Sequence, residues 1–334
     1  MKSFEGVLTK VYKYNSDTGL YEYFVSLPNT NRVVGMKAFD INGRMFLFVA
    51  NQLEGSSSTT TSRLFVINDD TGDFEVHQLF MTYEPIDVSY LRANNGNRYL
   101  LITNYKNFNV YEIDSVVYQW NNTEKQFSQI GLLRNKGAFY STLFEIDGQI
   151  FAGIANHYDT SDQYNVLDVI FKMNTKGSWS VHQKLPESGN GGISIKSFQT
   201  DTGLYLVSIQ YKNCIQNSIV YRWNPVTEEF EIHQKIPMVD CPVNSEIFKV
   251  GGEVFMITSN TMDKWGTGVQ YNVVNVIYKL EGSIFVKYLT VPGREVWNWS
   301  SFERNGELYL AQANSRHETN DDTVGTSLKI FQWK

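Results

Sequence analysis

The stretch IVYRWNPVTEEFEIHQKIP, residues 219–237, carries the pattern from which the fold can be inferred. Apolar and polar residues alternate in two runs around a turn that contains Pro225. This alternation is typical of two half-buried strands of a β-hairpin. The second run also holds His233 and Gln234 beside glutamates, a combination that occurs in catalytic sites. The stretch therefore raises the question of whether its chemistry acts on a ligand or supports the fold.

The same hairpin recurs along the chain. The aromatic residue Tyr221 has counterparts at steps of 50–57 residues, namely Tyr12, Phe65, Tyr118, Phe171, Tyr278 and Phe331. Two further runs precede each later hairpin: a strand with an apolar anchor before a tight turn, and a strand that ends in an amide residue. The amide residues are Asn51, Asn104, Asn156, Gln210, Asn260 and Asn314.

Four short strands in about 50 residues, with no helical periodicity, predict a β-propeller blade. Six complete units predict an all-β, six-bladed propeller of four-stranded antiparallel blades, formed as one domain by residues 1–334. Closure is expected to mix the termini: residues 20–27 form the outer strand of the blade that residues 295–333 begin, and residues 8–15 pair outside it. The alternative is a ring of seven separate blades.

The repeats answer the opening question. The dipeptide His-Gln occupies one register in three blades, at His77-Gln78, His182-Gln183 and His233-Gln234. A catalytic histidine is expected once rather than in three blades. These histidines are therefore predicted to be structural.

Composition excludes several function classes. The net charge is −6 and the pI is about 5.5, without a Lys/Arg cluster, so no nucleic-acid partner is expected. No apolar run of about 18 residues occurs, so no membrane insertion is expected. The N-terminal MKSFEGVLTK lacks the apolar region of a signal peptide, as expected of a cytosolic protein or a mature secreted chain. No P-loop, dinucleotide fingerprint or zinc motif is present.

The repeat elements FEIHQKIP, SFERNG, LYLAQAN and IVYRWN resemble the EAR repeat, also called EPTP. The resemblance covers essentially the whole chain. The chain is thereby similar to the propeller of the leucine-rich glioma-inactivated proteins. It implies a secreted, non-enzymatic propeller that binds other proteins or surface ligands. The family's propeller has seven blades and a leucine-rich repeat cap, whereas this chain has six complete units and no such cap.

Polar residues recur four and two positions before each apolar anchor, which places them on the face expected to line a central channel. Four of them carry oxygen ligands suited to a hard cation such as Ca²⁺, namely Asp87, Asn244, Glu246 and Asn298. The resemblance implies that Asp87 is a channel cation ligand. The alternative is a polar channel filled with water.

The two cysteines are both expected at the same end of the blades. Cys214 follows the amide-ending strand of one blade, and Cys241 lies in the crossing to the next blade. Because both connections emerge on the same face of the blades, the two cysteines could meet as a disulfide. The alternative, two free thiols, remains open at the level of the sequence.

Long loops follow the amide-ending strands and share one face with the crossings between blades. Long loops on a rigid scaffold commonly carry function. Aromatic rings beside polar groups suit sugars and protein hot spots. The predicted ligand-binding residues are Tyr105, Tyr158, Asp159, Trp265, Tyr271, Arg316 and His317. The alternative for each ring is that it packs beneath its own loop.

The sequence therefore predicts a binding module, not an enzyme, that recognises a glycan or a cell-surface or secreted protein. Two alternative functions stay open at this point. One is a metal-dependent hydrolase in which a channel cation polarises the substrate. The other is a structural scaffold.

Overall fold

A computed structural model describes residues 8–54, 57–68, 71–214, 217–262, 271–315 and 327–334. In this part of the chain, the regular structure consists of β-strands and one short 3-10 helix, η1 (Lys212–Cys214). The chain divides into two compact units: residues 1–152 with 171–180 (unit 1), and residues 153–170 with 181–334 (unit 2). The division passes through one of the blades, and the single domain over residues 1–334 stays a prediction.

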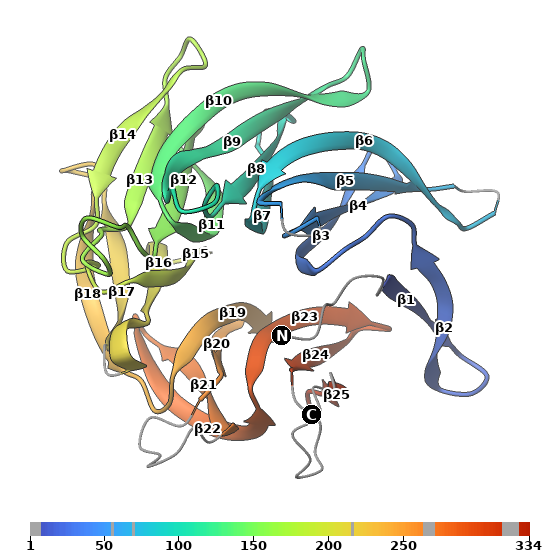
Figure 1. The fold of residues 1–334 in the computed structure, drawn as a ribbon. Coiled ribbons are helices and arrows are strands. Elements are labelled where there is room, and N and C mark those ends of the chain that lie inside the picture. The colour runs from blue at the N-terminus through green and yellow to red at the C-terminus, as the bar shows by residue number, and fades with distance from the viewer. Residues whose placement is uncertain (1–7, 55–56, 69–70, 215–216, 263–270, 316–326) are drawn as a thin grey trace. The chain divides into compact units, whose positions relative to one another are not determined.

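Three four-stranded sheets, each built from four consecutive strands, come first along the chain (Figure 1). The first contains β3 (Val33–Ile41), β4 (Arg44–Asn51), β5 (Thr59–Ile67) and β6 (Phe74–Tyr83). The second contains β7 (Pro85–Arg92), β8 (Arg98–Asn104), β9 (Glu112–Asn121) and β10 (Gln126–Lys136). The third contains β11 (Ala138–Ile146), β12 (Gln149–Asn156), β13 (Val169–Met173) and β14 (Trp179–Lys184).

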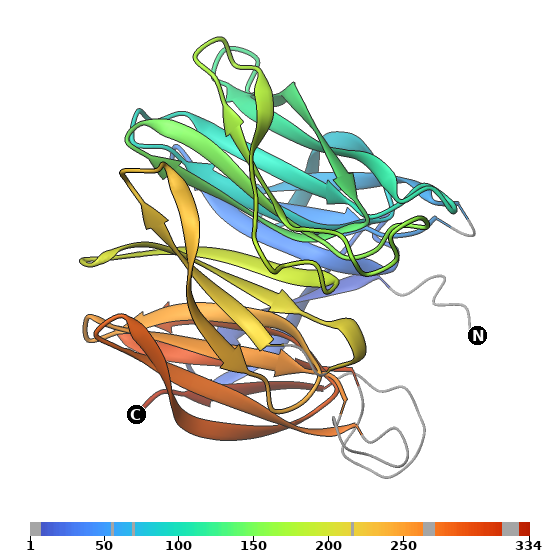
Figure 2. The same cartoon turned by 90° about the vertical axis from the view of Figure 1, so that its left-hand side faces the viewer.

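Two more four-stranded sheets of the same kind follow in unit 2. One contains β15 (Gly192–Thr200), β16 (Gly203–Gln210), β17 (Asn217–Asn224) and β18 (Glu229–Pro237). The other contains β19 (Pro242–Val250), β20 (Glu253–Asn260), β21 (Asn272–Glu281) and β22 (Ile284–Arg294). Figures 1 and 2 both show β19–β22 as one twisted sheet with its strands side by side.

The strands near the two ends of the chain form two smaller sheets. The last sheet has three strands, β23 (Val296–Arg304), β24 (Glu307–Asn314) and β25 (Ser327–Gln332). At the other end, β1 (Thr9–Asn15) and β2 (Leu20–Leu27) form the predicted hairpin as a two-stranded sheet. The predicted pairing of residues 20–27 with the last blade would join the two units and stays a prediction. The fold is the predicted all-β, six-bladed propeller, and the two-stranded sheet does not make a complete seventh blade.

The opening stretch forms the predicted hairpin of β17 and β18. Trp223 pairs with Phe230 and Tyr221 with Ile232, after a β-bulge between Val220 and Tyr221. Tyr221 and Phe230 are almost completely buried. Alternation therefore places the aromatic residues in the core, as the period of a strand requires.

The His-Gln dipeptides connect one blade to the next. Gln234 Nε2 donates to the carbonyl oxygen of Phe285 at 2.8 Å, and Gln234 Oε1 accepts from the backbone nitrogen of Phe285 at 2.8 Å. His233 Nε2 lies 2.8 Å from the carbonyl oxygen of Ser283. We call this arrangement the His-Gln clamp. It recurs at the other two dipeptides, through the pairs Gln78–Phe127 and Gln183–Phe230. The structural role predicted for these histidines is confirmed.

One blade boundary in unit 1 lacks the clamp. Gly131 occupies the register position of the clamp glutamine, and the next aromatic is Trp179 rather than Phe. A Cβ atom on Gly131 would lie 2.3 Å from Trp179 Cδ1, so no larger residue fits there. The indole therefore fills the space that the glutamine side chain occupies elsewhere.

The strand ends form two sides of each unit. The described residues that follow β4, β8, β12, β16, β20 and β24 lie beside the crossings between blades, and we call this the loop side. Backbone hydrogen bonds join them, as from Tyr211 N to Gly191 O at 3.1 Å and from Thr261 N to Cys241 O at 3.0 Å. The shared side predicted for loops and crossings is therefore confirmed. Tight turns, such as the one that carries Gly251 and Gly252 at positive φ, form the turn side.

Candidate functional site

The amide residue that ends each second strand fixes the base of the loop side. Asn104 donates from its backbone nitrogen to Ser115 Oγ at 3.1 Å and from Nδ2 to the Asp114 carbonyl at 2.9 Å. Its Oδ1 accepts from Tyr83 N in the crossing at 3.0 Å. One amide thus satisfies backbone groups of two other segments, which explains why the repeat requires Asn or Gln at this place.

Asp168 is a charged exception in this repeated arrangement. The same register position is filled by neutral residues in other blades, namely Ser62, Ser115, Ser218 and Asn275. Asp168 is 0% exposed. Its Oδ1 accepts from Asn156 N at 3.0 Å, and its Oδ2 accepts from Ser208 Oγ at 2.5 Å and Gln210 Nε2 at 3.1 Å. Burial raises the pKa of Asp168 to about 7, although the hydrogen bond from Ser208 opposes the shift.

A cluster of aromatic side chains lies on the loop side of unit 2, close in sequence to Asp168. The His157 ring centroid is 5.2 Å from that of Tyr164 and 5.5 Å from that of Tyr211. Tyr158 contacts Tyr164 edge-on at 5.3 Å. The three tyrosines are partly exposed, whereas His157 is buried. We call Tyr158, Tyr164 and Tyr211 the tyrosine cluster.

Backbone hydrogen bonds hold the tyrosine cluster in place. Gly191 N donates to the Tyr164 carbonyl at 2.7 Å, and Tyr211 N donates to the Gly191 carbonyl at 3.1 Å. Gly191 has a φ of 66°, and a Cβ there would lie 2.8 Å from Tyr164 Cδ1. Glycine is therefore required at this crossing, both for its conformation and for the close approach of the ring.

Polar groups border the tyrosine cluster. Lys212 Nζ donates to Asn165 Oδ1 at 2.9 Å across two segments of the loop side. Asp159, one of the predicted ligand-binding residues, is only 5% exposed, and its Oδ2 accepts from Ser161 Oγ at 2.5 Å. Burial lowers the pKa of His157 to about 4, so this ring is neutral at pH 7. The cluster therefore presents neutral aromatic rings beside one exposed cation and an amide.

The remaining predicted ligand-binding residues lie in different places. Tyr105 belongs to unit 1, where its ring contacts Tyr111 at 5.3 Å and Phe139 at 5.1 Å. Tyr271 is partly exposed and accepts a hydrogen bond at its carbonyl from Glu295 N at 2.8 Å. Trp265, Arg316 and His317 lie outside the described residues. Of the predicted set, the structure brings Tyr158 and Asp159 together in one loop, and a role for the set in binding stays a prediction.

The predicted calcium ligands of unit 2 take part in hydrogen bonds between neighbouring blades. Asn244 Oδ1 accepts from Ser194 Oγ at 2.7 Å, and Asn244 Nδ2 donates to Asn298 Oδ1 at 2.8 Å. Glu246 Oε1 accepts from the backbone nitrogen and the hydroxyl of Ser301, at 3.1 and 2.7 Å.

Asp87, the fourth predicted calcium ligand, lies in unit 1 and accepts from Ser141 N at 3.0 Å. Among the described residues, no group of three or more His, Cys, Asp or Glu side chains is arranged to hold a metal ion. One side-chain oxygen of each of the four predicted ligands accepts a hydrogen bond within the fold, so a cation would have to compete with these bonds. The calcium site stays a prediction.

The two cysteines form a disulfide in the structure, with Cα atoms 4.5 Å apart. The bond joins η1, after β16, to the crossing that leads into β19. It therefore ties a loop of the loop side to the neighbouring crossing.

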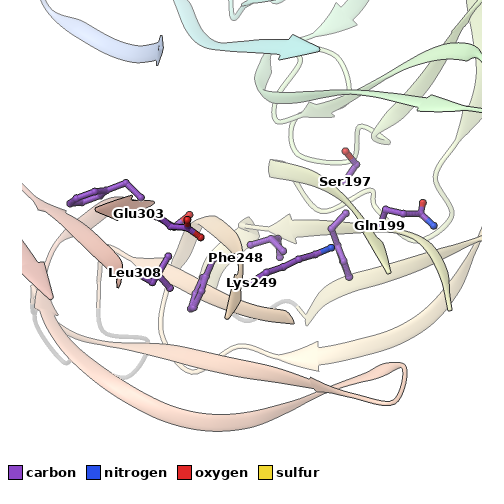
Figure 3. Close-up of a pocket in the computed structure, with 10 residues that line it drawn as sticks. Ser197, Gln199, Phe248, Lys249, Glu303 and Leu308 are labelled. Carbon is purple, nitrogen blue, oxygen red and sulfur yellow. The ribbon is translucent and has the colours of Figure 1, made fainter. Parts of the chain in front are cut away.

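A hollow of about 550 Å³ lies on the turn side of unit 2, and the sequence did not reveal it. Matching positions of β15, β19 and β23 line it, together with Leu308 (Figure 3). Phe198, Phe248 and Leu308 give it an apolar floor, and Figure 3 shows Lys249 extending toward the strand that carries Ser197 and Gln199. The repeat spacing could have identified these residues as equivalent, but not the space between them.

No helix in the part of the chain that the structure describes is long and apolar enough to cross a membrane.

Comparisons with known proteins agree with the repeat pattern. The EPTP domain family matches residues 180–224. The thrombospondin-type laminin G domain and EAR repeat-containing protein of Homo sapiens is 23% identical over 318 residues, which are 92% of this chain and 46% of that protein. Its Mus musculus counterpart is 24% identical over 88% of this chain and 44% of its own length. The chain thus spans less than half the length of these curated relatives.

Solved structures share the fold at low sequence identity. A putative 6-phosphogluconolactonase from Bacteroides fragilis has a TM-score of 0.64 and 14% identity, covering 99% of this chain and 89% of that one. A putative 6-phosphogluconolactonase from Bacteroides uniformis has a TM-score of 0.63 and 17% identity, covering 92% and 84%. Identity this low supports the fold alone. The EPTP match, the EAR-repeat relatives and the six repeated blades together support an EAR/EPTP-repeat β-propeller.

Proposed function

We propose that this propeller is a non-enzymatic, secreted binding module that recognises a glycan or an extracellular protein through the loop side. The tyrosine cluster of unit 2 carries the proposal. Tyr158, Tyr164 and Tyr211 are partly exposed, contact one another or His157, and are held by backbone hydrogen bonds through Gly191. Rigid aromatic rings beside polar groups lose little conformational entropy on binding, which favours recognition.

The chemistry of the described residues favours binding over catalysis. The three clamp histidines hold backbone groups of the next blade, and the fourth described histidine, His157, is buried and neutral at pH 7. The names of the curated relatives combine EAR repeats with a thrombospondin-type laminin G domain and mention no reaction. The solved lactonase-like structures share only the fold, so their chemistry does not transfer to this chain.

The disulfide supports a secreted location. Disulfides persist in oxidising compartments and are rare in the cytosol. The bond between Cys214 and Cys241 also lies on the loop side, where it restrains a loop and a crossing of the proposed binding surface. Secretion is tested by expressing the full natural protein in cultured cells and measuring the chain in the medium.

The binding proposal is tested with the purified chain on a glycan array and on an array of extracellular proteins. For a ligand found there, we expect Tyr158→Ala to weaken binding by about 1–3 kcal/mol without unfolding the protein. Tyr12→Ala is the matched control, because Tyr12 is 49% exposed but lies on β1, away from the loop side. Equal affinity of the Tyr158→Ala variant and the wild type would show that the tyrosine cluster is not the site. The absence of binding on both arrays would count against the binding module itself.

A further inference from the structure

A second loop-side feature, in unit 1, lies outside the tyrosine cluster. The loop between β8 and β9 carries Phe108 and Val110, which are 62% and 57% exposed. Asn107 and Val110 form an isolated antiparallel bridge, with N–H···O distances of 2.9 and 3.0 Å. The loop is therefore a small hairpin with Phe108 and Asn109 at its tip.

The backbone of Phe108 is strained. Its φ is 52°, in the left-handed region that glycine and asparagine tolerate and that a bulky side chain rarely adopts. The neighbouring Asn109 would fit this conformation more easily than Phe does. A strained backbone with an exposed aromatic side chain is a recognised sign of a functional position.

Surrounding residues hold the strained tip rigidly. Phe108 N donates to Ser58 Oγ at 3.0 Å, and Ser58 is only 3% exposed. Ser58 Oγ in turn donates to Glu84 Oε1 at 2.7 Å. At the base, Lys106 Nζ lies 3.9 Å from Glu84 Oε2 and 5.5 Å from the ring centroid of Tyr111. The fold thus fixes a conformation that presents two apolar side chains to solvent.

We infer that Phe108 and Val110 form an anchor for a protein partner that has an apolar pocket. Neither side chain has a polar atom with which to bind sugar hydroxyls. Lys106 and Glu84 at the base of the hairpin form an ion pair, so Lys106 does not offer the uncompensated basic charge that favours anionic membranes. Protein hot spots are typically aromatic side chains that are desolvated on insertion into a pocket. This anchor goes beyond the proposed role of the tyrosine cluster and lies in the other unit.

The test uses a substitution that suits the fold better than the native residue. Phe108→Asn removes the ring but tolerates the positive φ, so we expect an unchanged or higher Tm. Val110→Thr keeps the shape and adds a hydroxyl group. Val226→Thr is the matched control, because Val226 is 89% exposed in the tight turn between β17 and β18 on the turn side.

The probe is the surface of a panel of cultured cells, measured with the fluorescently labelled chain. We expect saturable binding that trypsin treatment of the cells abolishes. Phe108→Asn should weaken this binding about tenfold or more, and Val226→Thr should leave it unchanged. Phosphatidylcholine vesicles with and without phosphatidylserine should not bind the chain. A Phe108→Asn variant that binds like the wild type overturns the inference. So does binding that resists trypsin but is lost after glycosidase treatment, binding to the vesicles, or no saturable binding on any cell line.

Discussion

Replacing Asp168 by Asn should change the pH dependence of stability in a defined way. The Asp168 pKa is about 7 in the folded protein, against the ordinary aspartate value of 3.8 in the unfolded chain. Because the folded pKa is raised, the stabilisation is fully present below about pH 4 and is lost as the pH rises through about 7. Three pKa units correspond to about 4 kcal/mol, since each unit is worth about 1.4 kcal/mol.

The amide removes the charge but disturbs the hydrogen bonds. Its NH₂ group would face Gln210 Nε2, which now donates to the Asp168 carboxylate. This mismatch should cost about 1–3 kcal/mol at every pH. At pH 4 we therefore expect Asp168→Asn to be less stable than the wild type, and at pH 8 to be as stable or more stable. The difference between the two pH values should approach about 4 kcal/mol and does not depend on the size of the mismatch.

Guanidinium unfolding of both proteins from pH 4 to pH 8 measures this difference. Other titrating groups are common to the two proteins, so their contributions largely cancel. Asn275→Asp is the reciprocal control, because Asn275 occupies the same register, is 0% exposed and accepts from Asn260 N at 3.0 Å. That variant should acquire a loss of stability with rising pH. A destabilisation by Asp168→Asn that is identical at pH 4 and pH 8 would refute the assignment of a buried, ionisable carboxyl.

Four further predictions concern the scaffold. Gln234→Ala should lower the free energy of unfolding by about 1–3 kcal/mol, because the backbone N–H and C=O of Phe285 lose their hydrogen bonds to the glutamine. Thermal unfolding measures this loss, and an unchanged stability would refute the stabilising role of the clamp. Gly131→Ala should destabilise by about 1–3 kcal/mol through its clash with Trp179, and Trp179→Phe should rescue it, whereas a neutral Gly131→Ala would contradict the packing. Cys241→Ser should lower the free energy of unfolding by about 3 kcal/mol, because the lost disulfide joins residues 27 positions apart. The comparison is with the wild type before and after reduction, and equal stabilities would contradict the prediction. If calcium binds the predicted ligands, EDTA should lower the Tm and added Ca²⁺ should restore it; equal Tm values would remove calcium from consideration.

The repeat pattern predicted those features that depend on period and register. The alternation around Tyr221, the amide at Asn104 and the clamp glutamine at Gln234 recur at fixed spacing, because each blade must solve the same hydrogen-bonding problem. Recurrence also separated the clamp histidines from candidate catalytic residues. The sequence therefore predicted the blades and the structural role of the histidines, whereas the bonds by which the clamp connects the blades came from the structure.

Features that depend on three-dimensional proximity were not predictable in the same way. Asp168 differs from its serine counterparts at one position, but only the structure shows that its carboxyl group is fully buried. Asp159 looked like an exposed ligand-binding residue, yet the loop closes around it. The strain at Phe108 is a property of one backbone angle, and no composition or spacing reports it. A site that arises where one residue departs from the repeat is therefore identified from the three-dimensional structure rather than from the sequence pattern.

The His-Gln clamp also affects how the blades meet solvent. Phe230 lies on β18, the outermost strand of its sheet, and the Phe230 N–H is bound by Gln183 rather than by another strand. Unpaired edge strands can recruit strands of other molecules and begin aggregation. A side-chain amide that occupies both the N–H and the C=O of an edge residue removes one docking point for a foreign strand. The clamp therefore makes the rim of this protein less able to template intermolecular β-structure, a property that is valuable in a chain built almost entirely of strands.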